Sequence, residues 1–186
     1  MLLALICLLV QLFGDSEWLR YERSVLPTPD VWRFLTANFI HLGWSHWFLN
    51  MAGLALVYLL VGTQFSTPQW FAIIVISSLG VSVGLFALNP SLNWYVGFSG
   101  ALHGLLLAGA VAEIVHQRGR ERWFGGILLL CVAAKLVWEQ IVGALPGSAD
   151  MAGGPVVVDS HLYGAIAGLV AGFVISAMPN KRGSTG

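Results

Sequence analysis

The sequence predicts an all-α integral membrane protein, a bundle of six transmembrane helices that forms a single domain over residues 1–186. Hydrophobic residues make up 57% of the chain and charged residues 10%, and the mean hydropathy is +0.78. A soluble domain of this composition would lack the polar residues needed to cover its surface. Apolar runs alternate with polar segments, and most of these runs are close in length to a membrane span, which needs roughly 20 residues. Basic residues are as few as acidic ones, nine of each, so no nucleic-acid partner is expected.

The first predicted helix, residues 1–13, is apolar but shorter than a membrane span. No basic residue precedes this run and no small-residue cleavage site follows it, which favours a helix over a removable signal peptide. We expect this helix either to enter the membrane only to a shallow depth or to begin upstream of residue 1. It is expected to continue to about Trp18 at most. Residues 14–32 follow with Pro27, Pro29 and six charged side chains, a pattern typical of a polar loop at the membrane surface.

Five further spans are predicted from apolar runs bounded by turns. They cover residues 37–62, 70–88, 94–115, 123–145 and 159–178. The connection 116–122 carries three arginines and the C-terminal tail carries Lys181 and Arg182, so the positive-inside rule puts both segments in the cytoplasm. Residues 146–158 are predicted as a Gly/Pro-rich loop on the opposite side, together with the first loop.

The second predicted span carries polar residues where a helix facing lipid would carry leucine. His46, Asn50 and Gly53 are spaced four and seven residues apart and share one face, whereas His41 points about 140° away from His46. A polar stripe on a membrane helix faces the interior of the bundle. These side chains are therefore candidates for a site, or for hydrogen bonds that join helices.

The fourth predicted span contains a serine between glycines, a reactive hydroxyl at membrane depth. Gly97, Gly100 and Gly104 leave one side of this helix bare, so another backbone can approach Ser99. His103 follows four residues after the serine, on the same face. Taken alone, a Gly-x-Ser-Gly sequence is also typical of a packing seam between membrane helices.

The sixth predicted span supplies a partner for that serine. Its glycines Gly164, Gly168 and Gly172 recur every four residues, as on a helix face that another helix approaches closely. Packing the two glycine faces together would bring His161 near Ser99, and a serine beside a histidine is a nucleophile with its base.

Two further features of these segments fit acyl chemistry. His161 lies in the first turn of its helix, where Asp159 or Ser160 is expected to act as the cap. A developing oxyanion needs hydrogen-bond donors, which His46 and Asn50 can supply together with the backbone N–H of Ser99.

Together these motifs resemble the rhomboid family of intramembrane serine proteases. The matching motifs are Trp32-Arg33 in the first loop, His46-x-x-x-Asn50, Gly97-Phe98-Ser99-Gly100 and His161-x-x-Gly164-x-x-x-Gly168. The resemblance implies a six-helix rhomboid-like bundle and a catalytic dyad of Ser99 and His161 without a third, acidic member. It also implies that His46, Asn50 and the Ser99 amide bind the oxyanion, and that Asp159 is a cap.

The chain departs from the common rhomboid pattern at two positions. His103 stands where many rhomboids have tyrosine, and Ala37 where well-known bacterial members have another histidine. Gly100, Leu102, His103 and Gly104 resemble the rhombosortase branch. That branch implies cleavage of a C-terminal Gly-Gly sorting signal on exported proteins, with release by water or by transfer to an amine. The implied partners are substrate transmembrane segments and lipid, and the implied location is the bacterial inner membrane with the site towards the periplasm.

Lys135 and Glu139 place two charges one helical turn apart in the middle of the fifth predicted span. Each charge costs roughly 2.5 to 3.5 kcal/mol at the bilayer centre. Mutual pairing explains them, and contact with a substrate or a lipid headgroup is the alternative. With Gly97, Gly100 and His103 they complete the residues expected to bind substrate or to orient the site, and by resemblance the fifth helix is the substrate gate.

A second class of function is a non-enzymatic bundle that carries heme or transports a solute. Histidines on facing helices bind b-type heme, and the candidates are His41, His46, His103 and His161. The protease resemblance instead implies no cofactor and no metal, and the chain lacks a His-Glu-x-x-His zinc motif. Cys7 and Cys131 fall within apolar runs and are expected to be inert buried thiols.

Overall fold

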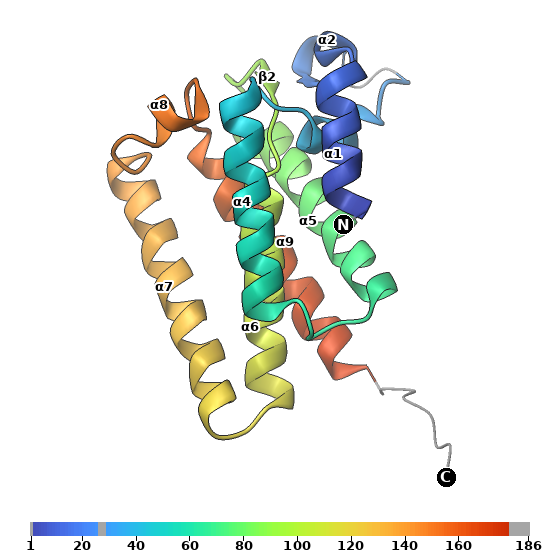
Figure 1. Ribbon diagram of the computed structural model, residues 1–186. Helices are drawn as coiled ribbons and strands as arrows, with labels where there is room; N and C mark the ends of the chain where they lie inside the picture. Colours follow the sequence, from blue (N-terminus) through green and yellow to red (C-terminus); the bar gives the residue numbers. More distant parts are fainter. Residues whose placement is uncertain (1, 26–28, 179–186) are drawn as a thin grey trace.

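A computed structural model describes residues 2–25 and 29–178 and contains a bundle of membrane helices (Figure 1). Within these residues, five helices are long and apolar enough to cross a membrane: α4 (Trp44–Val61), α5 (Thr67–Leu88), α6 (Ser99–His116), α7 (Arg120–Val142) and α9 (Val158–Ala177). A sixth apolar helix, α1 (Leu2–Phe13), is shorter. The predicted all-α membrane bundle is confirmed, with five full-length spans and one short helix.

The first helix does not continue to Trp18. At a rise of 1.5 Å per residue, the 12 residues of α1 extend about 18 Å, short of the roughly 30 Å apolar core of a bilayer. The helix ends because Asp15 begins a separate helix, α2 (Ser16–Leu19). The Asp15 carboxylate accepts hydrogen bonds from the amides of Glu17 and Trp18, which caps α2.

The first loop folds back onto the bundle. It contains β1 (Tyr21–Glu22), the 3-10 helix η1 (Arg23–Val25), α3 (Arg33–Thr36) and the 3-10 helix η2 (Ala37–Phe39). Strand β1 pairs antiparallel with β2 (Trp94–Tyr95), the segment that leads into α6. The buried guanidinium of Arg33 donates to the carbonyls of Glu17 (2.8 Å) and Arg20 (3.3 Å), so Arg33 of the Trp-Arg pair links α3 to the start of this loop.

Two predicted spans begin later than their hydropathy indicates. The predicted start at residue 37 is wrong, because residues 37–43 form η2 and an extended segment, and α4 begins at Trp44. His41 therefore lies in a loop. The predicted start at residue 94 is also wrong, because residues 94–95 pair as β2 and α6 begins only at Ser99. Both segments are rich in apolar side chains, but their backbones bond to distant parts of the chain: the Gly97 amide donates to the Ala37 carbonyl, and β2 pairs with β1.

The other predicted spans agree with the structure to within three residues. Helix α5 starts earlier than predicted because Ser66 and Gln69 form a capping box around Pro68, which suits the first turn. The predicted Gly/Pro-rich loop contains a short helix, α8 (Ser148–Ala152). Cys7 is a buried free thiol as predicted, but the free thiol of Cys131 is exposed on α7.

The core of the bundle is the contact between α6 and α9. Helix α6 lies at the centre of the bundle with the other spans around it (Figure 1). A methyl group added at Gly164 would meet the backbone of Gly100, and one added at Gly168 would meet the backbone of Gly104. These four glycines, which we call the glycine seam, let the two backbones touch as the sequence predicts.

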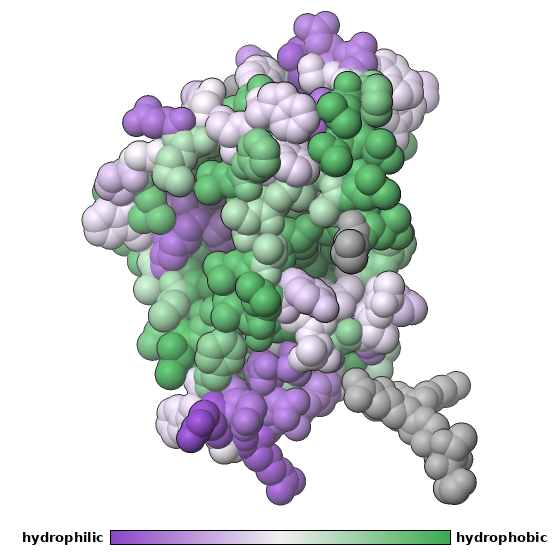
Figure 2. All heavy atoms as spheres, in the orientation of Figure 1, coloured by the Kyte–Doolittle hydropathy of each residue, from purple (hydrophilic) through white to green (hydrophobic). Residues whose placement is uncertain are grey.

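The surface has the polarity of a multi-pass membrane protein. On the face drawn in Figure 2, a hydrophobic belt crosses the middle of the molecule, and hydrophilic residues gather towards both ends. The connection between α6 and α7, with Arg118, and the first turn of α7, with Arg120 and Arg122, lie at the end opposite α2 and α8 (Figure 1). Lys181 and Arg182 lie outside the described residues.

Gly168→Val should lower the free energy of unfolding in mixed micelles by about 1 to 3 kcal/mol, because the new side chain would push α9 away from α6. Gly126→Val on α7 is the matched control, since nothing lies within 4 Å of a methyl group added there. Equal effects of the two substitutions on the unfolding curve would show that the glycine seam does not limit packing.

Candidate active site

A cavity of about 540 Å³ opens on one side of the bundle, and both Ser99 and His161 line it. Its walls come from α4, α6, α7, α8 and α9. Figure 2 shows a hydrophilic patch inside the hydrophobic belt, in the region between α4 and α7 of Figure 1. Lys135 also lines the cavity and 26% of its side chain is exposed, whereas His161 and Glu139 deeper in the cavity are buried.

Ser99 is the first residue of α6, and the turn before it requires glycine. Gly97 has φ of 130°, a conformation that residues with a side chain rarely adopt. A methyl group at this position would also lie 2.8 Å from Cε1 of His46. The amides in the first turn of a helix have no partner within the helix, so the Ser99 N–H is available at the positive end of α6.

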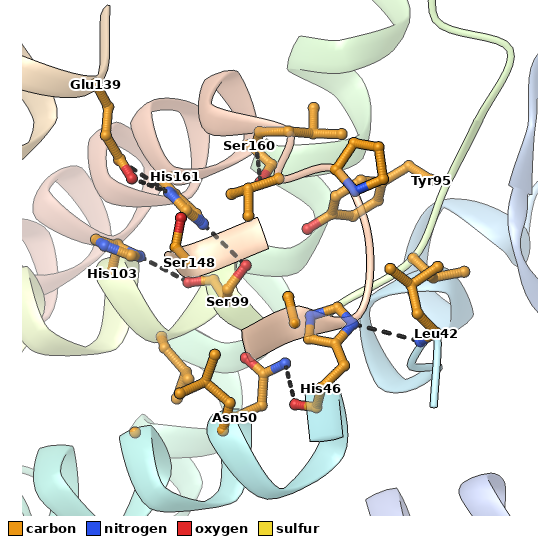
Figure 3. Close-up of a pocket in the computed structure, with 18 of the residues that line it drawn as sticks. Leu42, His46, Asn50, Tyr95, Ser99, His103, Glu139, Ser148, Ser160 and His161 are labelled. Carbon is orange, nitrogen blue, oxygen red and sulfur yellow. Dashed lines mark hydrogen bonds and ion pairs between the residues drawn. The ribbon is translucent and has the colours of Figure 1, made fainter. Parts of the chain in front are cut away.

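The structure brings His161 to the predicted nucleophile. Its Nε2 atom lies 3.0 Å from Ser99 Oγ, and the histidine side chain is buried (Figure 3). The glycine seam makes this contact possible, because Gly164 packs against the backbone of Gly100 directly beside the two side chains.

A carboxylate lies on the other side of the His161 ring. Nδ1 of His161 is 2.9 Å from Oε2 and 3.1 Å from Oε1 of Glu139 on α7 (Figure 3). Glu139 is only 3% exposed, so its carboxylate has been withdrawn from water to make this contact. The resemblance implies a dyad without an acidic member, whereas the structure places a buried carboxylate beside the histidine of that dyad.

Asp159 takes neither the role of triad acid nor that of cap. Its carboxylate accepts a hydrogen bond from the side chain of Asn89, and no side chain caps the start of α9. The hydroxyl of Ser160 donates to the carbonyl of Val157 at 2.7 Å. The prediction of a cap was wrong because α9 begins one residue earlier than expected, with Val157 in the capping position.

Lys135 and Glu139 form the predicted ion pair, at 2.8 Å, and Lys135 has further contacts. Its Nζ atom is 2.7 Å from Nε2 of His103 and 3.2 Å from Nδ1 of His161. Each of the two charged groups on α7 therefore reaches a histidine on another helix. The pairing explanation is right but incomplete.

His103 packs against His161. The two rings are stacked, with centroids 4.4 Å apart and planes 22° apart. Nδ1 of His103 lies 2.7 Å from the carbonyl oxygen of Ser99. That carbonyl accepts hydrogen bonds only, so Nδ1 carries the proton and Nε2 is the acceptor that faces Lys135.

Within the described residues, His103, Glu139 and His161 form a group that could hold a metal ion. One ligand atom from each lies within 4.8 Å of the others. The Lys135 ammonium contacts all three side chains, at 2.7 to 3.2 Å. Lys135 therefore supplies the positive charge that a metal ion would otherwise bring to this group.

His46 and Asn50 both line the cavity with Ser99. Nδ1 of His46 accepts the amide proton of Leu42 at 3.3 Å, so in the neutral ring the proton is on Nε2, the atom on the Gly97 side. The Asn50 amide donates to the carbonyl of His46 at 3.1 Å and keeps a second proton (Figure 3). Each of the two side chains thus has an N–H group that is available to donate a hydrogen bond.

Tyr95 belongs to the site, although the sequence did not indicate it. Its hydroxyl donates to the carbonyl of Gly97 at 2.8 Å, which holds the turn before the serine. Burial raises the pKa of Tyr95 to about 12, so the phenol stays protonated. The sequence alone does not distinguish this tyrosine from other aromatic residues at the starts of spans.

The predicted heme ligands fall into two pairs of adjacent rings. All four nitrogens of His103 and His161 already have partners. His41 contacts the edge of His46 with centroids 5.2 Å apart, and burial, together with the nearby His46, lowers the pKa of His41 to about 3. An iron ligated by His103 or His161 would have to displace the hydrogen bonds of the site, whereas both nitrogens of His41 are buried without a hydrogen-bond partner among the described residues.

Comparison with known proteins agrees with the geometry. Residues 28–178 match the Rhomboid domain family, and the chain therefore belongs to that family of membrane proteins. It is 30% identical to RHOMBOID-like protein 4 and 29% identical to RHOMBOID-like protein 5, both of Arabidopsis thaliana, over 85% of this chain. It is 27% identical to an uncharacterized protein of Mycobacterium tuberculosis, over 97% of this chain and 73% of that protein. The chain spans 37% and 48% of the two Arabidopsis relatives.

Proposed function

We propose that the protein is an intramembrane serine endopeptidase in which Ser99 is the nucleophile and His161 its general base. The contact of 3.0 Å between Ser99 Oγ and His161 Nε2, in a cavity at membrane depth, carries this proposal. A hydroxyl this close to a neutral imidazole nitrogen can lose its proton as it attacks a carbonyl carbon.

The reaction then runs in two steps. Ser99 Oγ bonds to the carbonyl carbon while its proton passes to Nε2 of His161; the C–N bond breaks, and the same proton passes to the leaving nitrogen. The resulting ester is attacked by water or by an amine, whose proton goes to Nε2 and then to the departing Ser99 oxygen. The base is unchanged at the end of the cycle.

The negative charge on the intermediate is bound by donors on two helices. The Ser99 amide at the start of α6 is one, and Nε2–H of His46 and the free proton of Asn50 are the others. Gly97 lets the ring of His46 approach the serine turn, and Gly100 lets α9 do so. Both glycines thus act by leaving space.

Substrate segments enter from the lipid between α4 and α7, where the hydrophilic patch lies (Figure 2). Transmembrane segments of exported proteins are the substrate class that such a side opening fits. Ser99 and His161 lie in the half of the bundle away from the arginine-rich connection, which the positive-inside rule assigns to the cytoplasm. The site therefore faces the periplasm, with the chain in the bacterial inner membrane.

The preferred substrate is a C-terminal Gly-Gly sorting signal, as in rhombosortases. This assignment of the substrate is supported by the similarity to the rhombosortase motif at four positions, Gly100, Leu102, His103 and Gly104. A single-span substrate with Gly-Gly before the apolar segment and a basic tail should be cut, and its Leu-Leu version should not. The mass of the new C-terminus distinguishes hydrolysis from transfer to an amine. Equal cleavage of both versions would refute the specificity for Gly-Gly but would leave the proposed protease activity unaffected.

Ser99→Ala and His161→Ala should each abolish cleavage of that substrate, and the double variant should be no worse than either, because the two groups act as a unit. Ser99→Ala should also abolish labelling by a fluorophosphonate. Ser148→Ala, which alters another serine of the cavity, is the control and should still be labelled. Cleavage by Ser99→Ala at the wild-type rate is incompatible with a serine protease.

His46→Ala should reduce kcat by about 100- to 1000-fold with little change in KM, because an oxyanion donor acts only in the transition state. Phe48→Ala, at an exposed position on the same helix, should leave both constants unchanged. An increase in KM alone would mean that His46 binds substrate and not the oxyanion.

A further inference from the structure

Five hydrogen bonds form a closed ring that begins and ends at Ser99. The Ser99 carbonyl contacts His103 (2.7 Å), His103 contacts Lys135 (2.7 Å), and Lys135 contacts Glu139 (2.8 Å). Glu139 then contacts His161 (2.9 Å), and His161 contacts the Ser99 hydroxyl (3.0 Å). We call this set the hydrogen-bond ring; Figure 3 shows its arms at Ser99 and at Glu139.

With Lys135 as an ammonium and Glu139 as a carboxylate, the five contacts of the ring imply one position for each proton. A carbonyl and a carboxylate only accept hydrogen bonds, and an ammonium only donates them. His103 must therefore donate from Nδ1 to Ser99 and accept at Nε2 from Lys135. His161 must donate from Nδ1 to Glu139, which leaves the lone pair of Nε2 facing the serine hydroxyl.

The contact between Lys135 and His161 is the competing arrangement. If Lys135 donated to Nδ1, the proton of the neutral ring would be on Nε2, and His161 could not accept the proton of Ser99. This contact is 3.2 Å, whereas both oxygens of Glu139 lie within 3.1 Å of the same nitrogen. Lys135 also has shorter contacts with Glu139 and His103. The distances favour the arrangement in which His161 is a base.

We propose that Glu139 is the acidic third member of a Ser99–His161–Glu139 triad, and that Lys135 is a positioning residue that holds Glu139 and His103 in place. This inference rests on the proposed function. Glu139 acts through His161: it fixes the tautomer and stabilises the imidazolium that forms when Ser99 gives up its proton. An ion pair that served packing alone could be replaced by apolar residues at no loss.

The decisive variant removes both charges together. In Glu139→Gln the Lys135 ammonium is left without its carboxylate, so the variant can fail through misfolding alone. The double variant Lys135→Met/Glu139→Gln keeps the volume of the site and leaves no unpaired charge. Its helix content and unfolding curve in micelles should match those of the wild type.

The measurement is inactivation of the full-length protein by a fluorophosphonate, which reports on Ser99 without a natural substrate. In Glu139→Gln and in the double variant, the maximal rate constant of inactivation should fall on the order of 10⁴-fold. The inhibitor concentration that gives the half-maximal rate should not change. Lys135→Met alone should lose less, because Glu139 still contacts His161. Glu139→Asp, which keeps the carboxylate, should recover part of the rate.

Two outcomes separate this inference from the proposed function. If the double variant reacts at the wild-type rate while Ser99→Ala is inert, then Glu139 only neutralises Lys135 and the triad is refuted, but the protease stands. If Ser99→Ala is itself cleavage-competent and labelled, the proposed function fails, and the triad with it.

Discussion

The close approach of α6 and α9 at the glycine seam is the contact on which the rest of the site depends. Each helix carries one reactive side chain beside the seam, Ser99 on α6 and His161 on α9. Because Gly100 and Gly164 have no side chains, the backbones touch and the two groups come within hydrogen-bond distance. A displacement of about 1 Å between reacting groups can cost a factor on the order of 100 in rate, so the proposed reaction depends on this packing.

The sequence predicts this part of the structure because its signal is local. Glycines at a four-residue spacing define a helix face wherever the helix lies, and the serine and the histidine each sit at the end of such a face. The starts of α4 and α6 were not predictable in the same way. They depend on the pairing of β1 with β2 and on the hydrogen bond from the Gly97 amide to the Ala37 carbonyl, which join residues far apart in sequence.

Glu139 shows, within the site, that sequence spacing does not predict contacts between different helices. Its spacing from Lys135 predicts a pair along one helix, and that pair forms. Its contact with His161 depends on how α7 is rotated relative to α9, which no spacing within either helix encodes. Tyr95 was missed for a different reason: its hydroxyl bonds to a residue only two positions away, and that bond depends on the turn at Gly97 with its positive φ.

Membrane depth explains why such a site would carry two extra charges. Away from water, an uncompensated charge is costly, and in the proposed reaction the attack by Ser99 would create both an oxyanion and an imidazolium. Lys135 and Glu139 cancel before the reaction, and the two new charges cancel each other during it. The group as a whole stays neutral throughout, while Glu139 lies beside the new positive charge and the start of α6 beside the new negative one. A lone dyad would hold the same net charge but would have no fixed negative group next to its imidazolium.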